Sequence, residues 1–323
     1  MEIKKLIGKE RIDLSSLGKK VSFVLEENST SNLLLNNFNG DENVEIEVKD
    51  NSILNLSILA DSPLKNLKIT ANVGLNSQII VYFADFSTKI NGLDFSINLN
   101  KENAYCYYHG ASLATKDDKK EILVSVYHNA PSTWARVDNY GVAKDASKLM
   151  FAGTSHILNG KIKSKTQQNA KIMVFDSECD AIAKPILKID ENDIEASHGA
   201  AVGKISDEHL FYLTSRGLSI EEAKMLITLG YLKPIFKGFD QEDVDYMNKY
   251  QYDSLLKRSN NVNKDTLDDL KQRYKIGKGT NKLEEFIINK LKSKFMDILK
   301  KKRDYDTANE IIYNIINNNL KKD

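Results

Sequence analysis

The feature that most constrains the fold is a series of short segments, from about Val44 to Ile189, in which apolar and polar residues alternate. Such alternation is typical of half-buried β-strands. The segments recur about every 10 to 14 residues, the breaks between them are rich in Asn, Asp, Ser, Gly and Lys, and no helical stretch lies among them. This pattern predicts a mainly β domain, and the spacing allows a sandwich, a barrel or a β-solenoid.

The pattern changes to helical spacing after Gly203. Ser206 followed by two acidic residues is typical of a helix start, and Gly217 is a stop signal. A capping-box pattern at Ser219 begins a second apolar-periodic stretch, which runs to Gly230. Two short helices in tandem are therefore predicted after the strands.

The remainder of the chain is more polar. Residues 238–282 are rich in Lys, Asp and Asn with weak periodicity, which predicts a polar surface excursion, and 283–299 has the apolar spacing of an amphipathic helix. We expect lead-in strands over 1–40, the β core over 41–205 and a helical region over 206–323.

The overall composition argues against several partner classes. The 323 residues include 46 basic and 45 acidic side chains, for a formal net charge of +1, so no excess of charge favours nucleic acid or an anionic membrane. No apolar run approaches the ~20 residues of a spanning helix, and the N-terminus lacks the pattern of a signal peptide. We expect a cytoplasmic protein.

No motif in the sequence declares an enzyme. The stretch IGKGTNK at 276–282 resembles a phosphate loop, but Gln272 stands where that motif needs its first glycine. The two cysteines, Cys106 and Cys179, belong to no zinc-like spacing, and each is expected to be a buried small side chain.

Of the five histidines, His109, His128 and His156 fall in predicted strands, where a hydrogen-bonded core or interface position is the usual role, and His209 falls in the first predicted helix. His198 differs because Ser197 and Gly199 flank it with small residues, which would let a partner or ligand approach closely. It is the candidate functional histidine.

The run ENDIEASHGAAVGKISDEHLFYLTSRGLSIEEAKMLITLGYL, residues 191–232, closely resembles the signature region of the SufB/SufD family of iron–sulfur cluster assembly scaffolds. The segments VYHNAPSTWARVDNYGVAKDASKLMFAG (126–153) and KTQQNAKIMVFDSECDAIAKPILKI (165–189) follow the order of family features upstream. The resemblance covers roughly 126–236 and is weak before that.

The resemblance implies a right-handed parallel β-helix followed by a small helical region. Members of the family pair through the end of the β-helix, as SufB–SufD heterodimers or as homodimers, and each helical region docks one ABC-type ATPase, SufC. The missing phosphate loop is then expected, because the ATPase is a separate chain. For this chain, the implied partner-binding residues are Phe211, Tyr212, Arg216, Leu226 and Tyr231.

The resemblance also implies roles for two side chains. SHGA at 197–200 is nearer to SufD than to SufB, and His198 falls on the histidine proposed to help hold the cluster at the subunit interface. An imidazole is a suitable iron ligand. Cys179 lies near the place of a second SufB cysteine, whereas the stretch 168–170 lacks the cysteine that is thought to receive sulfur in SufB.

Three functions remain open at this point. The first is a SufD-like, non-catalytic subunit of a SufBCD-type complex. The second is a homodimeric scaffold that binds the nascent cluster itself through Cys179, His198 and acidic residues, and the third is a β-helix interaction protein without a metal function. In the first two, the cluster is a transient cargo at a subunit interface. FADH₂ is implied only for the wider complex.

Overall fold

The computed structural model describes residues 2–60, 64–87, 90–216 and 218–239. The predicted polar excursion, from residue 240 onward, and the predicted helix at 283–299 lie outside the described residues. Residues Met1–Tyr212 and Gly230–Gly238 make up one compact unit, and the described residues outside these ranges belong to a second unit.

Strands dominate the first unit, and they form two parallel sheets. The odd sheet contains β1 (Glu2–Leu6), β3 (Lys20–Leu25), β5 (Asn43–Val48), β7 (Leu67–Val73), β9 (Ile90–Leu99), β11 (Lys119–His128), β13 (Lys148–Ile157) and β15 (Asp180–Ile189). The even sheet contains β2 (Gly8–Asp13), β4 (Thr30–Asn36), β6 (Ile53–Ala60), β8 (Gln78–Asp85), β10 (Tyr105–Ala114), β12 (Trp134–Ala143), β14 (Ser164–Val174) and β16 (Ile194–Lys204).

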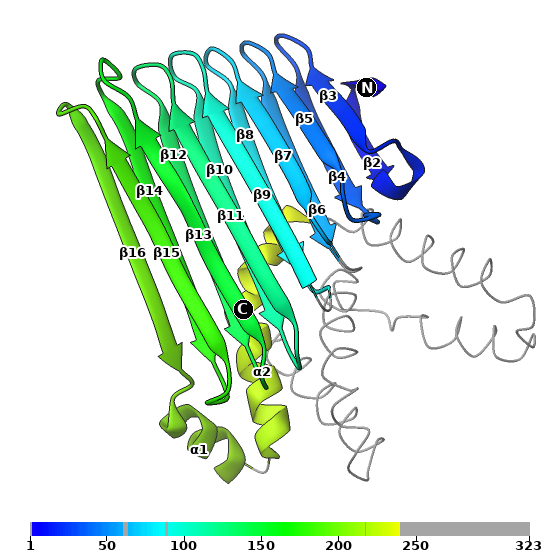
Figure 1. Ribbon diagram of the computed structural model, residues 1–323, viewed down its shortest axis with the longest axis vertical. Coiled ribbons are helices and arrows are strands. Elements are labelled where there is room, and N and C mark those ends of the chain that lie inside the picture. The colour runs from blue at the N-terminus through cyan, green and yellow to red at the C-terminus, as the bar shows by residue number, and fades with distance from the viewer. Residues whose placement is uncertain (1, 61–63, 88–89, 217, 240–323) are drawn as a thin grey trace, which may run out of the picture. The chain divides into compact units, whose positions relative to one another are not determined.

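Consecutive strands alternate between the two sheets, so the chain winds through coils that each add one strand to each sheet (Figure 1). This arrangement confirms the predicted parallel β-helix and excludes the sandwich and the barrel that the strand spacing alone allowed. The first 40 residues, expected as lead-in strands, form β1 to β4 within the same two sheets. A short 3-10 helix, η1 (Leu14–Ser16), follows β2.

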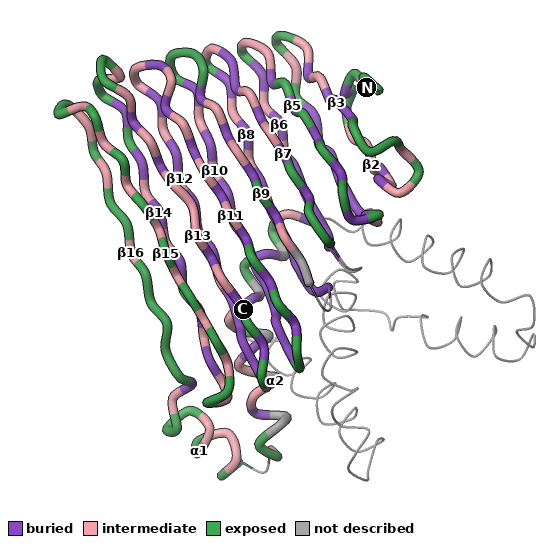
Figure 2. The backbone as a smooth tube through the Cα atoms, in the orientation of Figure 1, coloured by how far each residue is buried: buried purple, intermediate pink, exposed green. Residues whose placement is uncertain are grey.

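The core lies between the two sheets, and buried residues alternate with more exposed ones along many of the strands (Figure 2). Because parallel strands place paired residues on the same face, like side chains stack from coil to coil. Val44, Ile69 and Phe95, for example, occupy successive coils at one register position, and each is buried. The alternation seen in the sequence is this inward row.

Asparagines with positive φ make the tight turns that lead from the odd sheet to the even sheet. Asn51, Asn76 and Asn103 have φ angles of 57°, 51° and 57°, a region that asparagine adopts more readily than most residues. Their side chains stack as well, since Asn76 Nδ2 donates to Asn51 Oδ1 (3.3 Å) and Asn103 Nδ2 donates to Asn76 Oδ1 (2.9 Å). The Asn-rich breaks in the sequence are therefore turns that form a ladder along the solenoid.

The coils lengthen along the chain. Gly8 pairs with Ser31, 23 residues later, whereas Lys148 pairs with Asp180, 32 residues later. The strands lengthen in parallel, from 5 and 6 residues in β1 and β2 to 10 and 11 residues in β15 and β16. The solenoid consequently has a narrow N-terminal end and a wide C-terminal end (Figure 1).

The two predicted helices are present as α1 (Asp207–Ser215) and α2 (Ile220–Leu232), and a 3-10 helix, η2 (Lys233–Gly238), follows them. The segment Gly230–Gly238 belongs to the solenoid unit. Its Tyr231 ring packs edge-on against Tyr140 of β12 at 5.6 Å, and Ser57 of β6 donates a hydrogen bond to the carbonyl oxygen of Gly238. Among the described helices, none is long and apolar enough to span a membrane.

Candidate functional site at the wide end of the solenoid

The last coil, β15 and β16, forms the open end of the solenoid. Each of these strands pairs on one side only within the described part of the chain, β15 with β13 and β16 with β14. The free side of each strand therefore presents main-chain N–H and C=O groups. Figure 2 shows β16 exposed along almost its whole length, in contrast to the strands before it.

A row of inward-facing side chains is uncovered at this end. Its members are identified by their register with the buried rows of β13 and β14, and they are Ala181, Ala183, Pro185, Leu187, Ile189, Ile194, Ala196, His198, Ala200, Val202 and Lys204. Apart from His198, the row contains one acidic or basic residue, Lys204, at the end of β16. The row continues the core of the protein and ends at solvent.

His198 lies in the middle of this row. It pairs with Gln168, which is 4% exposed, so the imidazole is on the inward side of β16 while remaining exposed itself. Ser197 and Gly199, the small neighbours noted in the sequence, point to the opposite side because side chains alternate along a strand. The small residues beside the imidazole are instead Ala196 and Ala200, two positions away on the same face. The approach to His198 is open, as the sequence predicted, but through different residues.

Gly199 has a separate role on the outer side of β16. A Cβ atom added there would lie 3.2 Å from Asn169 Oδ1, which is tighter than an ordinary contact. The Asn169 amide is itself held in place, because its Nδ2 donates to Asp138 Oδ1 at 2.8 Å. The glycine of SHGA thus lets β16 lie close against a fixed side chain of β14.

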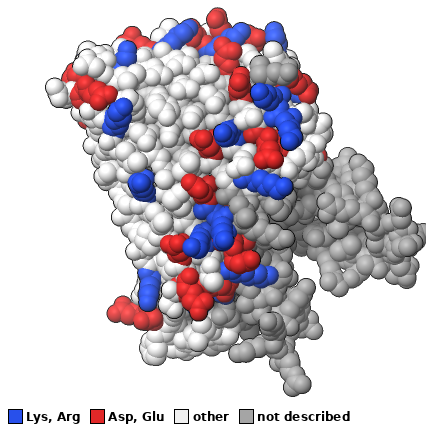
Figure 3. Space-filling model, in the orientation of Figure 1, with Lys and Arg blue, Asp and Glu red and all other residues white. Residues whose placement is uncertain are grey.

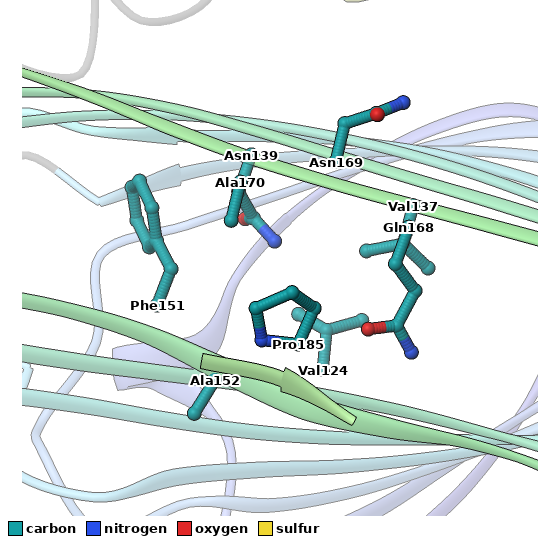
Figure 4. Close-up of a pocket in the computed structure, with 9 residues that line it drawn as sticks. All are labelled: Val124, Val137, Asn139, Phe151, Ala152, Gln168, Asn169, Ala170 and Pro185. Carbon is teal, nitrogen blue, oxygen red and sulfur yellow. The ribbon is translucent and has the colours of Figure 1, made fainter. Parts of the chain in front are cut away.

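A polar layer lies directly beneath His198. Gln168 Nε2 donates to Ser155 Oγ at 2.6 Å, and Thr166 Oγ1 donates to the same oxygen at 2.9 Å. A cavity of ≈ 10 Å³ adjoins this layer and is closed by Pro185 from β15, with the amides of Asn139 and Gln168 beside it (Figure 4). That volume suits about one water molecule. The alternation in the sequence did not identify these residues, because it does not show which polar side chains face the inside of a coil.

The stretch 168–170, where the SufB cysteine is absent, lies next to the candidate histidine. Gln168, Asn169 and Ala170 pair in register with His198, Gly199 and Ala200. The two segments were linked in the sequence only through resemblance, and the parallel register now makes them neighbours.

Cys179 lies elsewhere on the same end. It precedes the first residue of β15, its thiol donates to the Asp145 carbonyl oxygen at 3.2 Å, and burial raises its pKa. Its neighbour Glu178 lines a shallow depression together with Lys204, the last residue of β16. Cys179 is therefore at the level of the last residue of β16. His198 is six residues before Lys204, which at about 3.3 Å per residue places the imidazole about 20 Å from the thiol along the strands. One chain does not bring the two candidate ligands together.

No group of three or more His, Cys, Asp or Glu side chains among the described residues is arranged to hold a metal ion. A single chain therefore offers one accessible imidazole at an unpaired sheet edge. An imidazole in that position can complete a ligand set whose other members come from a second chain.

The predicted partner-binding residues are distributed over the helices. Phe211 and Tyr212 of α1 are 75% and 55% exposed, and Arg216, just after α1, is also exposed. Tyr231 is partly buried against Tyr140, and burial raises the pKa of its hydroxyl to about 12. Leu226 belongs to α2, and its side chain lies outside the described residues.

Charges of both signs are intermixed on the face shown in Figure 3, between wide areas without charged side chains. This face offers no single-sign patch of the kind that a polyanion requires. It agrees with the near-zero net charge of the whole sequence.

Comparison with known proteins places this geometry in context. Residues 15–231 match the family model described as SUF system FeS cluster assembly, SufBD core domain. The chain is 30% identical over 142 residues to the iron–sulfur cluster assembly protein SufD of Bacillus subtilis, which covers 44% of this chain and 32% of that protein. It is 28% identical over 138 residues to SufBD family proteins of Staphylococcus saprophyticus and Staphylococcus aureus, which covers 43% of this chain and 30% of each relative. The matches thus span about a third of the length of these relatives.

Proposed function

Because the chain belongs to the SufBD family of the SUF iron–sulfur cluster assembly system, whose members are assembly proteins, we propose that it acts as a SufD-like scaffold subunit in the cytoplasm. In this proposal, its wide end pairs with a SufB-like chain or with a second copy. Its helical region docks a SufC-type ATPase, and the cluster is a transient cargo at the paired ends.

The observation that carries the proposal is the uncovered inward row with His198 at its centre. Strand edges of 10 and 11 residues, with an almost uncharged row between them, favour extension of both sheets by another solenoid. Pairing there would bury His198 among small side chains, and a histidine in such a junction is available as a cluster ligand. The position of Cys179, about 20 Å away by strand geometry, favours a shared ligand set over one built within a single chain.

We expect the full chain to co-purify with its cognate SufC-type ATPase. Substituting Phe211→Glu and Tyr212→Glu together is expected to weaken this association by about tenfold or more, because exposed aromatic side chains dominate many protein interfaces. The matched control is Ile186→Glu, which changes a 41% exposed side chain on the outer face of β15. If the wild-type chain is purified without the ATPase, the result counts against the docking proposal.

Replacing His198 with alanine is expected to leave the fold intact, because the side chain is exposed, and to reduce cluster yield in the reconstituted complex to about a tenth or less. Loss of a group that only supports a metal ligand already costs roughly 10- to 100-fold in affinity. Cluster content is measured by iron and sulfide analysis and by visible absorbance after anaerobic reconstitution. His209→Ala in α1 is the control, and an unchanged yield for His198→Ala would exclude the ligand role.

The same reconstitution on the isolated chain separates the proposal from a self-sufficient homodimer. A homodimeric scaffold would bind a cluster without a SufB-like partner and would lose it on Cys179→Ala. The SufD-like assignment predicts that the isolated chain acquires no stable cluster and that Cys179→Ala changes the yield of the complete complex little.

A further inference from the structure

A segment at the end of the described helices lies on the outer face of the even sheet. This segment, Gly230–Gly238, belongs to the solenoid unit, and its 3-10 helix, η2, runs beside β6, β8 and β10. We call it the clasp. Leu59, Ala84 and Ala111 share one register position on the outer side of these strands, yet each is at most 1% exposed. The outer face of the even sheet is therefore covered where η2 crosses it.

His109 lies in this covered area. It is on the outer side of β10, in register with Tyr82 of β8 and Asp138 of β12, and it is only 5% exposed. The imidazole stacks on the Tyr140 ring with 5.2 Å between ring centroids, and the Tyr82 ring is 6.1 Å away on the other side. A histidine that faces outward from a sheet and is nevertheless buried must be covered by another segment.

The clasp contacts both of the rings that flank His109. Tyr231, near the start of the clasp, packs edge-on against Tyr140 at 5.6 Å. Gly238, at its end, lies so close to Tyr82 that a Cβ atom added to the glycine would overlap the tyrosine side chain. Because Tyr140 and Tyr82 belong to the strands on either side of β10, the clasp crosses the strand that carries His109.

The carboxylate that pairs in register with His109 is already bonded to other groups. Asp138 Oδ2 accepts from Arg136 Nε at 2.8 Å, and Asp138 Oδ1 accepts from Asn169 Nδ2 at 2.8 Å. His109 Nδ1 is 3.4 Å from the Tyr107 hydroxyl, which is uncharged. The titratable and charged side chains that the described residues place around the imidazole are Tyr82, Tyr107, Arg136, Asp138, Tyr140, Lys171, Tyr231 and Lys237. Three of them are cations and one is an anion, so the surroundings favour an uncharged ring.

We propose that the clasp closes over an uncharged His109 and opens when this imidazole gains a proton. A charged ring beneath the closed clasp would be removed from water beside a carboxylate whose oxygens are already in use, which is unfavourable. Opening returns the ring to solvent. Since Tyr231 is the last but one residue of α2, opening also separates its ring from Tyr140 and makes it accessible to a partner. The proposal concerns a device within the chain and does not rest on the proposed function.

The direction of the pH dependence follows from the environment of the ring. Burial lowers the pKa of His109, Asp138 opposes this shift, and Arg136 and Lys237 add to it. With the clasp open, the exposed imidazole would titrate near its usual value of 6.5. Below that pH the open form binds a proton that the closed form does not. The clasp is therefore fully closed above about pH 6.5 and loosens as the pH falls below this value.

The test is hydrogen exchange of the full chain at pH 7.5 and pH 5.5, read from peptides that cover 230–238. After correction for intrinsic exchange rates, we expect the protection of the wild type to fall several-fold, and by at most about tenfold, which is the limit for one proton at one pH unit below 6.5. His109→Gln keeps a polar side chain that does not titrate and is expected to show no such fall. The control is His209→Gln, which changes an exposed histidine of α1 and should behave like the wild type. Equal falls in the wild type and in His109→Gln, or no fall in the wild type, would overturn the proposal.

A second measurement, an NMR titration of the His109 ring in the full chain, does not depend on substituting the histidine. Gly238→Val puts a branched side chain where Tyr82 lies and is expected to hold the clasp open, so that His109 titrates near pH 6.5 and at a higher pH than in the wild type. The matched control is Gly203→Val in β16, where an added Cβ atom meets no other atom within 4 Å, and His109 should titrate there as in the wild type. Circular dichroism checks that both variants are folded. If His109 titrates at the same pH in folded Gly238→Val and in the wild type, the clasp does not control its protonation and the proposal is overturned.

Discussion

Replacing Lys120 with alanine is expected to lower the free energy of unfolding by about 3–5 kcal/mol, a large share of the roughly 5–15 kcal/mol that stabilises a typical domain. Lys120 is on the inward side of β11, and its Nζ lies 2.8 Å from Asp85 Oδ1 of β8, with both side chains at most 1% exposed. Ser112 also donates to this carboxylate, at 2.8 Å. The alanine variant would leave the Asp85 carboxylate in the core without its counter-ion.

Urea unfolding followed by circular dichroism measures this loss as a lower midpoint at an unchanged slope. The control is Lys148→Ala, which removes a 3.3 Å pair with Asp180 at the surface, where the side chains are 58% and 51% exposed, and which we expect to cost less than about 1 kcal/mol. The double variant Lys120→Met with Asp85→Asn should recover much of the loss, because no charge is then buried. Equal costs for Lys120→Ala and Lys148→Ala would contradict the prediction.

Acidification is expected to remove about 3 kcal/mol of stability through His128 alone. This imidazole is fully buried at the end of β11, with Nδ1 2.8 Å from Thr133 Oγ1 and no hydrogen-bond partner for Nε2 among the residues that the structure describes. Burial, assisted by the nearby His156, lowers its pKa from 6.5 to about 4. Between these two pH values the unfolded chain binds a proton that the folded chain does not, so the contribution is fully present above about pH 6.5 and declines as the pH falls toward 4.

The measurement is the free energy of unfolding in urea at several pH values between 7.5 and 4 for the wild type and for His128→Gln. Carboxylates contribute equally to both proteins, so the difference between the two curves isolates the histidine. We expect the curves to converge as the pH falls, since the variant has no group to titrate at this position. Parallel curves would show that His128 does not keep a lowered pKa in the native protein.

The fold was predictable to the level of its class because each coil repeats the same local chemistry. Alternating segments marked most strands, and the helix signals at Ser206 and Ser219 correctly placed α1 and α2. The choice of a solenoid came from resemblance, because alternation reports only that a strand has two faces and not which strand is its neighbour. The burial of His109 and His128 was also expected, whereas the polar partners inside the coil, such as Ser155 with Gln168, depend on register that the spacing does not encode.

The candidate site was predictable in part. Flanking small residues singled out His198, and the structure does give its imidazole an open approach, although through Ala196 and Ala200 rather than Ser197 and Gly199. The separation of Cys179 from His198 was not apparent, because nineteen positions in sequence span a turn and two strands that run in opposite directions.

The lengthening of the coils also bears on how the protein unfolds. Residues that pair between β2 and β4 are 23 positions apart in the sequence, and residues that pair between β13 and β15 are 32 positions apart. Structure can therefore propagate from one coil to the next without a distant nucleus. Among the described residues, the last coil has a neighbour on one side only, and none of its inward side chains is buried. Local opening should therefore begin at β15 and β16. A partner seated on this end would suppress that opening first, which couples assembly of the complex to the kinetic lifetime of the subunit.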